Sequence, residues 1–207
     1  MQGLAQRVTA VRPDMISAGA SYGEPAWVWG QGCARHGATW PRRLWYSGDE
    51  LVAWGWAFLP RQVLRSDGSV ADVTGASLIY QVHPGHTERV DEVIEWYDGV
   101  AAGLERTAVP TNAEDFALER WAAHGYESDA AVLGDDGDWT QLNERDLTDV
   151  KQPALPAGFR FRTAEEAGPE AAVRAHLDAW ASSSYTAQSY EDVRQTAAYR
   201  GDLHVLV

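Results

Sequence analysis

The chain of 207 residues is 45% hydrophobic and 11% aromatic, which supplies enough apolar side chains for one large or two small domains. Its net charge is −13, from 30 acidic and 17 basic residues, so it lacks the basic field that attracts nucleic acid, which is not an expected partner. No apolar run reaches the roughly 18 residues of a membrane span, and residues 1–14 lack a signal-peptide pattern, which predicts a cytoplasmic protein without a membrane partner.

Residues 1–40 are rich in Gly, Pro and Trp and are predicted to be irregular, apart from a short helix around AWVWG at residues 26–30. The only cysteine is Cys33, which excludes an internal disulfide and a cysteine-cluster metal site. We expect it to be a small packed residue.

A β-hairpin is predicted at residues 42–60, where apolar residues alternate on both sides of a turn at residues 47–49. Residues 76–82, ASLIYQV, form a second apolar run that is typical of a buried strand. The apolar positions of the hairpin include Leu44, Tyr46, Val52, Trp54 and Trp56.

Residues 87–103 predict an amphipathic helix with an acidic outer face. Val90, Val93, Ile94 and Tyr97 stand at positions i, i+3, i+4 and i+7, which lie on one side of a helix. The next segment, residues 104–109, is predicted to be a short strand.

A second helix is predicted at residues 115–125, because Thr111 and Glu114 have the spacing of a capping box in front of it. Gly125 stands where a left-handed helix cap is expected. Residues 128–147 then predict a hairpin around residues 135–137. The apolar face of the helix is formed by Ala117, Leu118, Trp121 and Ala122.

The composition then changes, which predicts a first domain at 1–147, a linker at 148–157 and the start of a second domain at 158–207. Residues 159–162, FRFR, predict a strand, and Thr163 with Glu166 predicts a capped helix after it. A further helix is predicted at 189–199 and a strand at 202–207. A sheet that begins this way is not buried by residues 158–207 alone, so we expect the second domain to be incomplete in this chain. The face of the capped helix carries Val173, Leu177 and Trp180.

Two peptides resemble the GNAT superfamily of N-acetyltransferases. EDFALERWAAHGYES is similar to the last helix of that family, with Ala117, Gly125 and Tyr126 at its small, glycine and aromatic positions. QVHPG resembles the fourth strand and the turn where a valine and a proline precede the pyrophosphate loop. Residues 158–207 resemble the opening of a second GNAT-like domain, so the whole chain looks like a tandem arrangement of the mycothiol synthase type.

The resemblance implies an α/β (α+β) fold with a mixed, mostly antiparallel sheet flanked by helices. It implies acetyl-CoA as cofactor and a small-molecule primary amine as the acceptor. It also places the cofactor turn at Val82, His83, Gly85 and Thr87.

The turn departs from the family pattern, in which small residues let backbone N–H groups approach the diphosphate. The three key positions fall on Thr87, Val90 and Glu92, and none matches. A carboxylate about 4 Å from a phosphate costs on the order of 4 kcal/mol at an effective dielectric of about 20. Trp121 stands where the family often has a tyrosine that protonates the thiolate, and indole does not serve as that acid. We therefore expect a degenerate cofactor turn.

The nearest candidates for a catalytic base are His83 and Glu88; the alternative is that both are solvated residues at a helix start. His83 and His86 have the spacing of metal ligands, but no third ligand follows nearby, so no metal site is predicted. Trp54 and Trp56 are candidates for an aromatic ligand pocket, with a core position as the alternative.

Two functions follow from these observations. One is N-acetyl transfer, with the first domain in a supporting role. The other is a non-enzymatic GNAT-fold module that does not bind coenzyme A and takes a small aromatic or amine ligand. The apolar strand at 202–207 also predicts a homodimer through the C-terminal segment, since an unpaired edge tends to pair.

Overall fold

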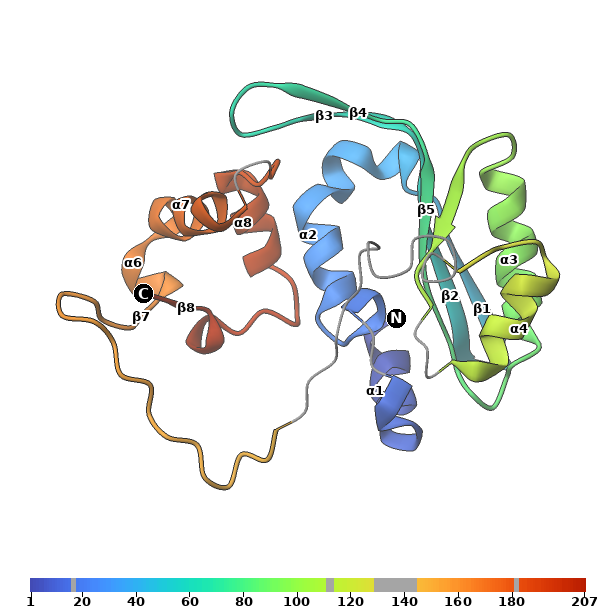
Figure 1. Ribbon diagram of the computed structural model, residues 1–207, viewed down its shortest axis with the longest axis horizontal. Coiled ribbons are helices and arrows are strands. Elements are labelled where there is room, and N and C mark those ends of the chain that lie inside the picture. The colour runs from blue at the N-terminus through green and yellow to red at the C-terminus, as the bar shows by residue number, and fades with distance from the viewer. Residues whose placement is uncertain (16–17, 111–113, 129–144, 181–182) are drawn as a thin grey trace.

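The fold is built on a mostly antiparallel sheet flanked by helices, a mixed α+β architecture (Figure 1). The computed structural model describes residues 1–15, 18–110, 114–128, 145–180 and 183–207, without the side chains of residues 18, 33 and 34. Its helices are α1 (Gln2–Val11), α2 (Glu24–His36), α3 (Arg89–Val100), α4 (Asp115–Ala123), α6 (Ala164–Ala167), α7 (Pro169–Ala179) and α8 (Ala187–Arg194). Its strands are β1 (Arg42–Ser47), β2 (Glu50–Phe58), β3 (Arg61–Leu64), β4 (Val70–Val73), β5 (Ala76–Val82), β6 (Arg106–Ala108), β7 (Arg162–Thr163) and β8 (Val205–Leu206).

The main sheet has the strand order β1-β2-β5-β6 among the described residues. The pairs β1–β2 and β2–β5 are antiparallel, whereas β5 and β6 run parallel and are joined through α3. The predicted hairpin is confirmed, with Gly48 at φ +59° in its turn. The predicted strand at residues 76–82 is confirmed as β5.

The two faces of the sheet pack against different helices, because side chains alternate along each strand. Leu78, Tyr80 and Val82 belong to the core under α3 and α4. Trp54 and Trp56 belong to the core beneath α1 and α2, where both are at most 1% exposed. Leu44 and Tyr46 are exposed instead.

Helices α3 and α4 agree with the predicted elements, apart from details of α4. All four predicted core residues of α3 are buried. Gly125 follows α4 with φ +84°, as predicted. Leu118 is 37% exposed and Ala122 is also exposed, so the buried face of α4 is narrower than predicted. The helix begins at Asp115 with Glu114 at its N-cap, and Thr111 lies outside the described residues.

The short helix predicted around residues 26–30 is confirmed as part of α2, but the prediction that the rest of residues 1–40 is irregular is wrong, because α1 and the remainder of α2 occupy much of it. Leu4, Ala5 and Val8 bury one side of α1, and their positions i, i+1 and i+4 have a helical spacing. Pro25 stands in the first turn of α2, where a missing N–H costs nothing. Cys33 lies in α2, but its side chain is outside the described part of the chain, so its packing stays a prediction.

The sequence did not predict the hairpin β3–β4, which extends from the main sheet toward the C-terminal helices (Figure 1). Its turn contains Gly68 at φ +82°. The backbone N–H of Ser66 donates a hydrogen bond of 3.0 Å to the carbonyl of Ser183. The hairpin therefore touches the C-terminal segment.

The C-terminal segment packs on α2 through α8, and α2 lies between the sheet and this segment (Figure 1). The predicted capping box is confirmed, because Thr163 Oγ1 accepts from Glu166 N and Glu166 Oε2 accepts from Thr163 N. The predicted strand at 159–162 is largely wrong, since β7 covers only Arg162–Thr163. Trp180 is 68% exposed, so it does not share a buried face with Val173 and Leu177.

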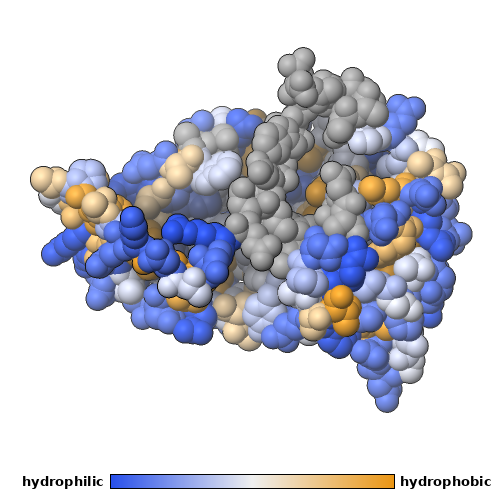
Figure 2. Space-filling model, turned by 60° about the horizontal axis from the view of Figure 1, so that its bottom comes forward, coloured by the Kyte–Doolittle hydropathy of each residue, from blue (hydrophilic) through white to orange (hydrophobic). Residues whose placement is uncertain are grey.

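Strand β8 pairs antiparallel with β7, so the strand that was expected to be unpaired has a partner. The homodimer through this segment stays a prediction. Figure 2 shows a face on which most described residues are hydrophilic and the hydrophobic ones form small separate groups. The predicted hairpin around 135–137 lies outside the described residues. In the part of the chain that is described, no helix has the length and apolar character to cross a membrane.

Candidate functional site

The predicted cofactor turn links the end of β5 to the start of α3. Strand β5 pairs with β6 only from Ala76 to Leu78, and a last hydrogen bond joins Val109 N to the Leu78 carbonyl at 3.2 Å. The remaining part of β5, up to Val82, continues beyond the described pairing with β6. Among the described residues, the pairing of β5 with β6 therefore ends at Leu78, four residues before the end of β5.

The backbone of the turn uses several of its own N–H groups. His83 N donates to the Val52 carbonyl at 2.8 Å, and His86 N donates to the His83 carbonyl at 2.8 Å. Arg89 N and Val90 N donate to the carbonyls of His86 and Thr87 at 3.0 and 3.2 Å. A donor that is already bonded within the turn does not add to an anion site unless the turn rearranges.

Acidic residues dominate the first turn of α3. Asp91 and Glu92 follow the N-cap residue Glu88, so three carboxylates lie at the helix end where partial positive charge would attract phosphate. Arg89 pairs with Glu92 and lies 3.9 Å from Glu88, while Arg120 pairs with Asp91. These two arginines offset part of the acidic charge, and both are engaged in ion pairs with the carboxylates.

Two of the positions that depart from the family pattern, Val90 and Glu92, lie in different surroundings. Val90 is fully buried in the core, so its side chain points away from the turn surface. Glu92 is 41% exposed and ion-paired. The obstacle to a phosphate at this site is therefore the acidic charge and the occupied N–H groups rather than the bulk of Val90.

His83 is poorly arranged to act as a base. Its Nδ1 accepts a hydrogen bond of 3.1 Å from Gly85 N, so the neutral ring carries its proton on Nε2 and has its basic nitrogen occupied. Burial lowers the pKa of His83, assisted by His86 and Arg7 and opposed by Glu50. The ring is therefore neutral near pH 7 but has no free lone pair in this arrangement.

Glu88 is a solvated residue at the helix start. Its side chain is 61% exposed and lies 3.5 Å from His86 Nδ1. The structure thus brings His83, Gly85, Thr87 and Glu88 into one turn but gives neither candidate base a confined position for an acceptor amine. Among the described residues, no group of three or more His, Cys, Asp or Glu side chains is placed to hold a metal ion.

A buried chain of hydrogen bonds passes through Tyr80, whose side chain lies on the same face of the sheet as that of Val82. Trp121 Nε1 donates to Tyr80 Oη at 2.9 Å, and Tyr80 Oη donates to Glu114 Oε2 at 2.8 Å. Tyr80, Glu114 and Trp121 are 2%, 3% and 4% exposed. Burial, and then the Glu114 carboxylate, raises the pKa of Tyr80 well above its usual value, so the phenol remains a donor.

The sequence did not indicate this chain. Trp121 was assigned from its spacing to Gly125, but the hydrogen-bond chain depends on Tyr80 and Glu114, which lie 34 positions apart. The one indication in the sequence is Tyr80 itself, because a tyrosine in a buried strand needs a hydrogen-bond partner for its hydroxyl.

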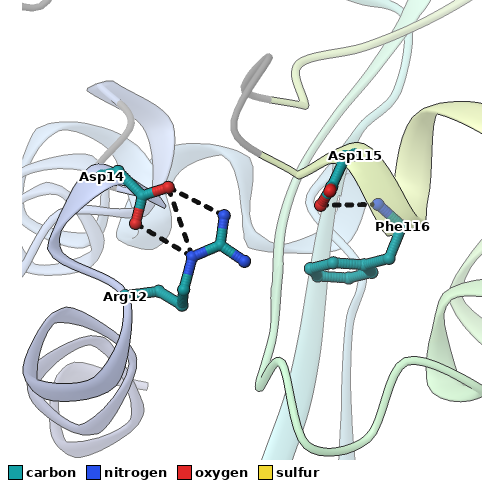
Figure 3. Close-up of polar contacts among 4 residues, drawn as sticks. All are labelled: Arg12, Asp14, Asp115 and Phe116. Atoms are coloured by element: carbon teal, nitrogen blue, oxygen red, sulfur yellow. Dashed lines mark hydrogen bonds and ion pairs between the residues drawn. The ribbon is translucent and has the colours of Figure 1, made fainter.

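The start of α4 also faces the segment that follows α1 (Figure 3). Arg12 donates to Asp14 through Nε and Nη2, at 2.9 and 2.8 Å, and its side chain points toward Asp115 and Phe116. The pair with Asp14 raises the pKa of Arg12, and Asp115 contributes to the shift. Phe116 packs against both cores.

A comparison with protein-family models finds no match, and a comparison with curated proteins finds no significant one.

Proposed function

We propose that this protein acts in N-acetyl transfer of the GNAT type, from acetyl-CoA to the primary amine of a small molecule. In this proposal residues 1–147 form a supporting unit that does not itself hold coenzyme A. Residues 158–207 open a second GNAT-like unit.

The observation that carries the proposal is the arrangement around β5. A mostly antiparallel sheet ends in the parallel pair β5–β6, and the crossover between them contains the turn and α3. Among the described residues the pairing ends at Leu78, and β5 continues to Val82, where the turn that resembles the pyrophosphate loop begins. The supporting role is favoured by the bonded N–H groups of this turn and by the carboxylates of Glu88, Asp91 and Glu92.

A calorimetric titration of the 207-residue chain with acetyl-CoA at low and moderate salt tests the supporting role. We expect no saturable heat and no thermal shift, because carboxylates at the turn repel the diphosphate. Binding in the micromolar range would contradict the supporting role and make catalysis by this unit the working hypothesis.

The second candidate is a non-enzymatic GNAT-fold module, which the same occupied turn favours. A thiol-release assay with acetyl-CoA and a panel of primary amines, run on the longest natural form of the protein, separates the two. Amine-dependent release of coenzyme A supports acetyl transfer. Its absence across the panel would leave the binding module.

A further inference from the structure

A cavity of about 560 Å³ lies where the starts of α1 and α2 meet the end of α8 over strand β2. Its volume falls within the range of small-molecule sites, roughly 300 to 1,000 Å³. Trp56 in its wall belongs to the core under α1 and α2. The predicted cofactor turn follows Val82, whose side chain belongs to the core on the opposite face of the sheet. The cavity is therefore separate from the predicted cofactor turn.

Two indoles form the aromatic side of the cavity. Trp29 is 52% exposed and Trp56 is 1% exposed, and their ring centres are 6.4 Å apart. The Arg42 guanidinium lies over both rings, 4.6 Å from the centre of Trp29 and 5.2 Å from that of Trp56. Because a cation of the protein already uses these indoles, a ligand contributes a flat ring here rather than a charge.

The opposite side of the cavity presents hydrogen-bond acceptors. The Asp192 carboxylate accepts one hydrogen bond, of 2.8 Å, from Gln188 Nε2, which leaves most of its accepting capacity for a ligand. Thr196 also lines the cavity, and because its hydroxyl donates to the Val193 carbonyl at 2.7 Å, the oxygen is left with the capacity to accept. This side of the cavity therefore favours a ligand that donates hydrogen bonds.

The charges around the cavity also favour a ligand whose hydrogen-bond donor is positively charged. None of the described residues that line it is Lys or Arg, and the Arg42 guanidinium lies over the indoles, on the aromatic side of the cavity. Met1 also lines it, and burial, assisted by Arg7, lowers the pKa of its α-amino group. The net charge of −13 attracts cations toward the molecule as a whole.

We propose that this cavity binds an arylalkylamine, with the flat ring against Trp29 and the primary ammonium donating to Asp192. The binding does not depend on acetyl-CoA or on the proposed acetyl transfer. A ring without an amine loses the charge-assisted hydrogen bond, and a ring with a carboxylate meets the charge of Asp192.

The test is a calorimetric titration of the whole chain, without acetyl-CoA, using three ligands that share one ring: 2-phenylethylamine, 2-phenylethanol and phenylacetate. We expect saturable binding of the amine, about tenfold weaker binding of the alcohol and no binding of the acid, since one charge-assisted hydrogen bond is worth roughly a factor of ten. Amine affinity weaker than about 1 mM, or equal affinity for the acid, would overturn the proposal.

Two variants assign the contacts. Asp192→Asn is expected to weaken amine binding about tenfold and leave alcohol binding unchanged, whereas Trp29→Leu is expected to weaken both. The matched controls are Asp178→Asn and Trp180→Leu, which change exposed residues at the end of α7 outside the cavity. Equal binding by Asp192→Asn and the parent would refute the role of Asp192. The amine titrations test only the cavity, and the acetyl-CoA titration tests only the supporting role of residues 1–147, so either proposal can be refuted without the other.

Discussion

The hydroxyl of Tyr80 is the polar link between strand β5 and helix α4. It accepts from Trp121 and donates to Glu114 inside a core where all three side chains are almost fully buried. A buried polar group without its partner costs about 1 to 3 kcal/mol. The hydroxyl is therefore expected to contribute to stability beyond the burial of its ring.

Replacing Tyr80 with Phe removes this hydroxyl and keeps the ring. We expect the free energy of unfolding to fall by about 1 to 3 kcal/mol, because Trp121 Nε1 loses its acceptor and Glu114 loses a donor. Urea unfolding measures the change. The matched control is Tyr46→Phe, whose side chain is 51% exposed and which should change stability by less than about 0.5 kcal/mol. A Tyr80→Phe variant as stable as the parent would show that the link carries no net stability.

At the scale of elements, the capping box predicted at the start of α6 is confirmed. Thr163 and Glu166 form the reciprocal hydrogen bonds of a capping box, at 3.2 and 2.9 Å. The box of the same spacing at Thr111 and Glu114 stays a prediction, because Thr111 lies outside the described residues. Glu114 stands at the N-cap of α4, and its carboxylate accepts from Tyr80.

The capping box predicts different effects for removing the Thr163 hydroxyl and for keeping it. Thr163→Ala should lower stability by about 0.5 to 2 kcal/mol, because the N–H of Glu166 loses its acceptor at the start of α6. Thr163→Ser keeps the hydroxyl and should lose much less. Hydrogen exchange of the amides in α6 measures the local effect, and equal protection in the alanine and serine variants would contradict it.

Elements with a strong period could be predicted from the sequence, and those defined by packing could not. The alternation at 42–58 and the helical spacing of Val90, Val93, Ile94 and Tyr97 gave β1, β2 and α3. Of α2 only residues 26–30 were predicted, because Gly30 and Gly32 lower the helix propensity of the segment. Helix α1 was missed although Leu4, Ala5 and Val8 have a helical spacing. The hairpin β3–β4 was missed although Asp67-Gly68 is a strong turn signal.

The same limit applies to the sites. The residues of the cofactor turn are contiguous in sequence, so their proximity could be predicted, but the hydrogen bond that occupies His83 Nδ1 could not. The amine cavity joins Trp29 to Asp192 from helices far apart in the chain. Such a site appears only when α8 is docked against α2.

At the scale of the whole molecule, α2 connects the sheet to the C-terminal segment. Trp27 of α2 packs against the cluster that contains Tyr185 and Tyr190, and Tyr185 stacks on Trp27 at 5.4 Å. The predicted division into 1–147 and 158–207 therefore has a packed contact across it. The closest approach is at Gly30, where an added Cβ would lie 2.6 Å from Val193 Cγ2 and 2.7 Å from its Cα.

Gly30→Ala is expected to push α8 away from α2. Alanine gains up to about 1 kcal/mol of helix propensity over glycine. Crowding against the Val193 backbone costs about 1 to 3 kcal/mol, so the net effect is destabilising and should lower the melting temperature by a few degrees. The control is Gly99→Ala in α3, where an added Cβ meets nothing within 4 Å and the same propensity gain should leave the protein as stable or more stable. If both variants melt at the same temperature, the close packing at Gly30 is not required for α8 to dock on α2. If only Gly30→Ala melts lower and also loses 2-phenylethylamine binding, the docking of α8 holds together both the molecule and its proposed cavity.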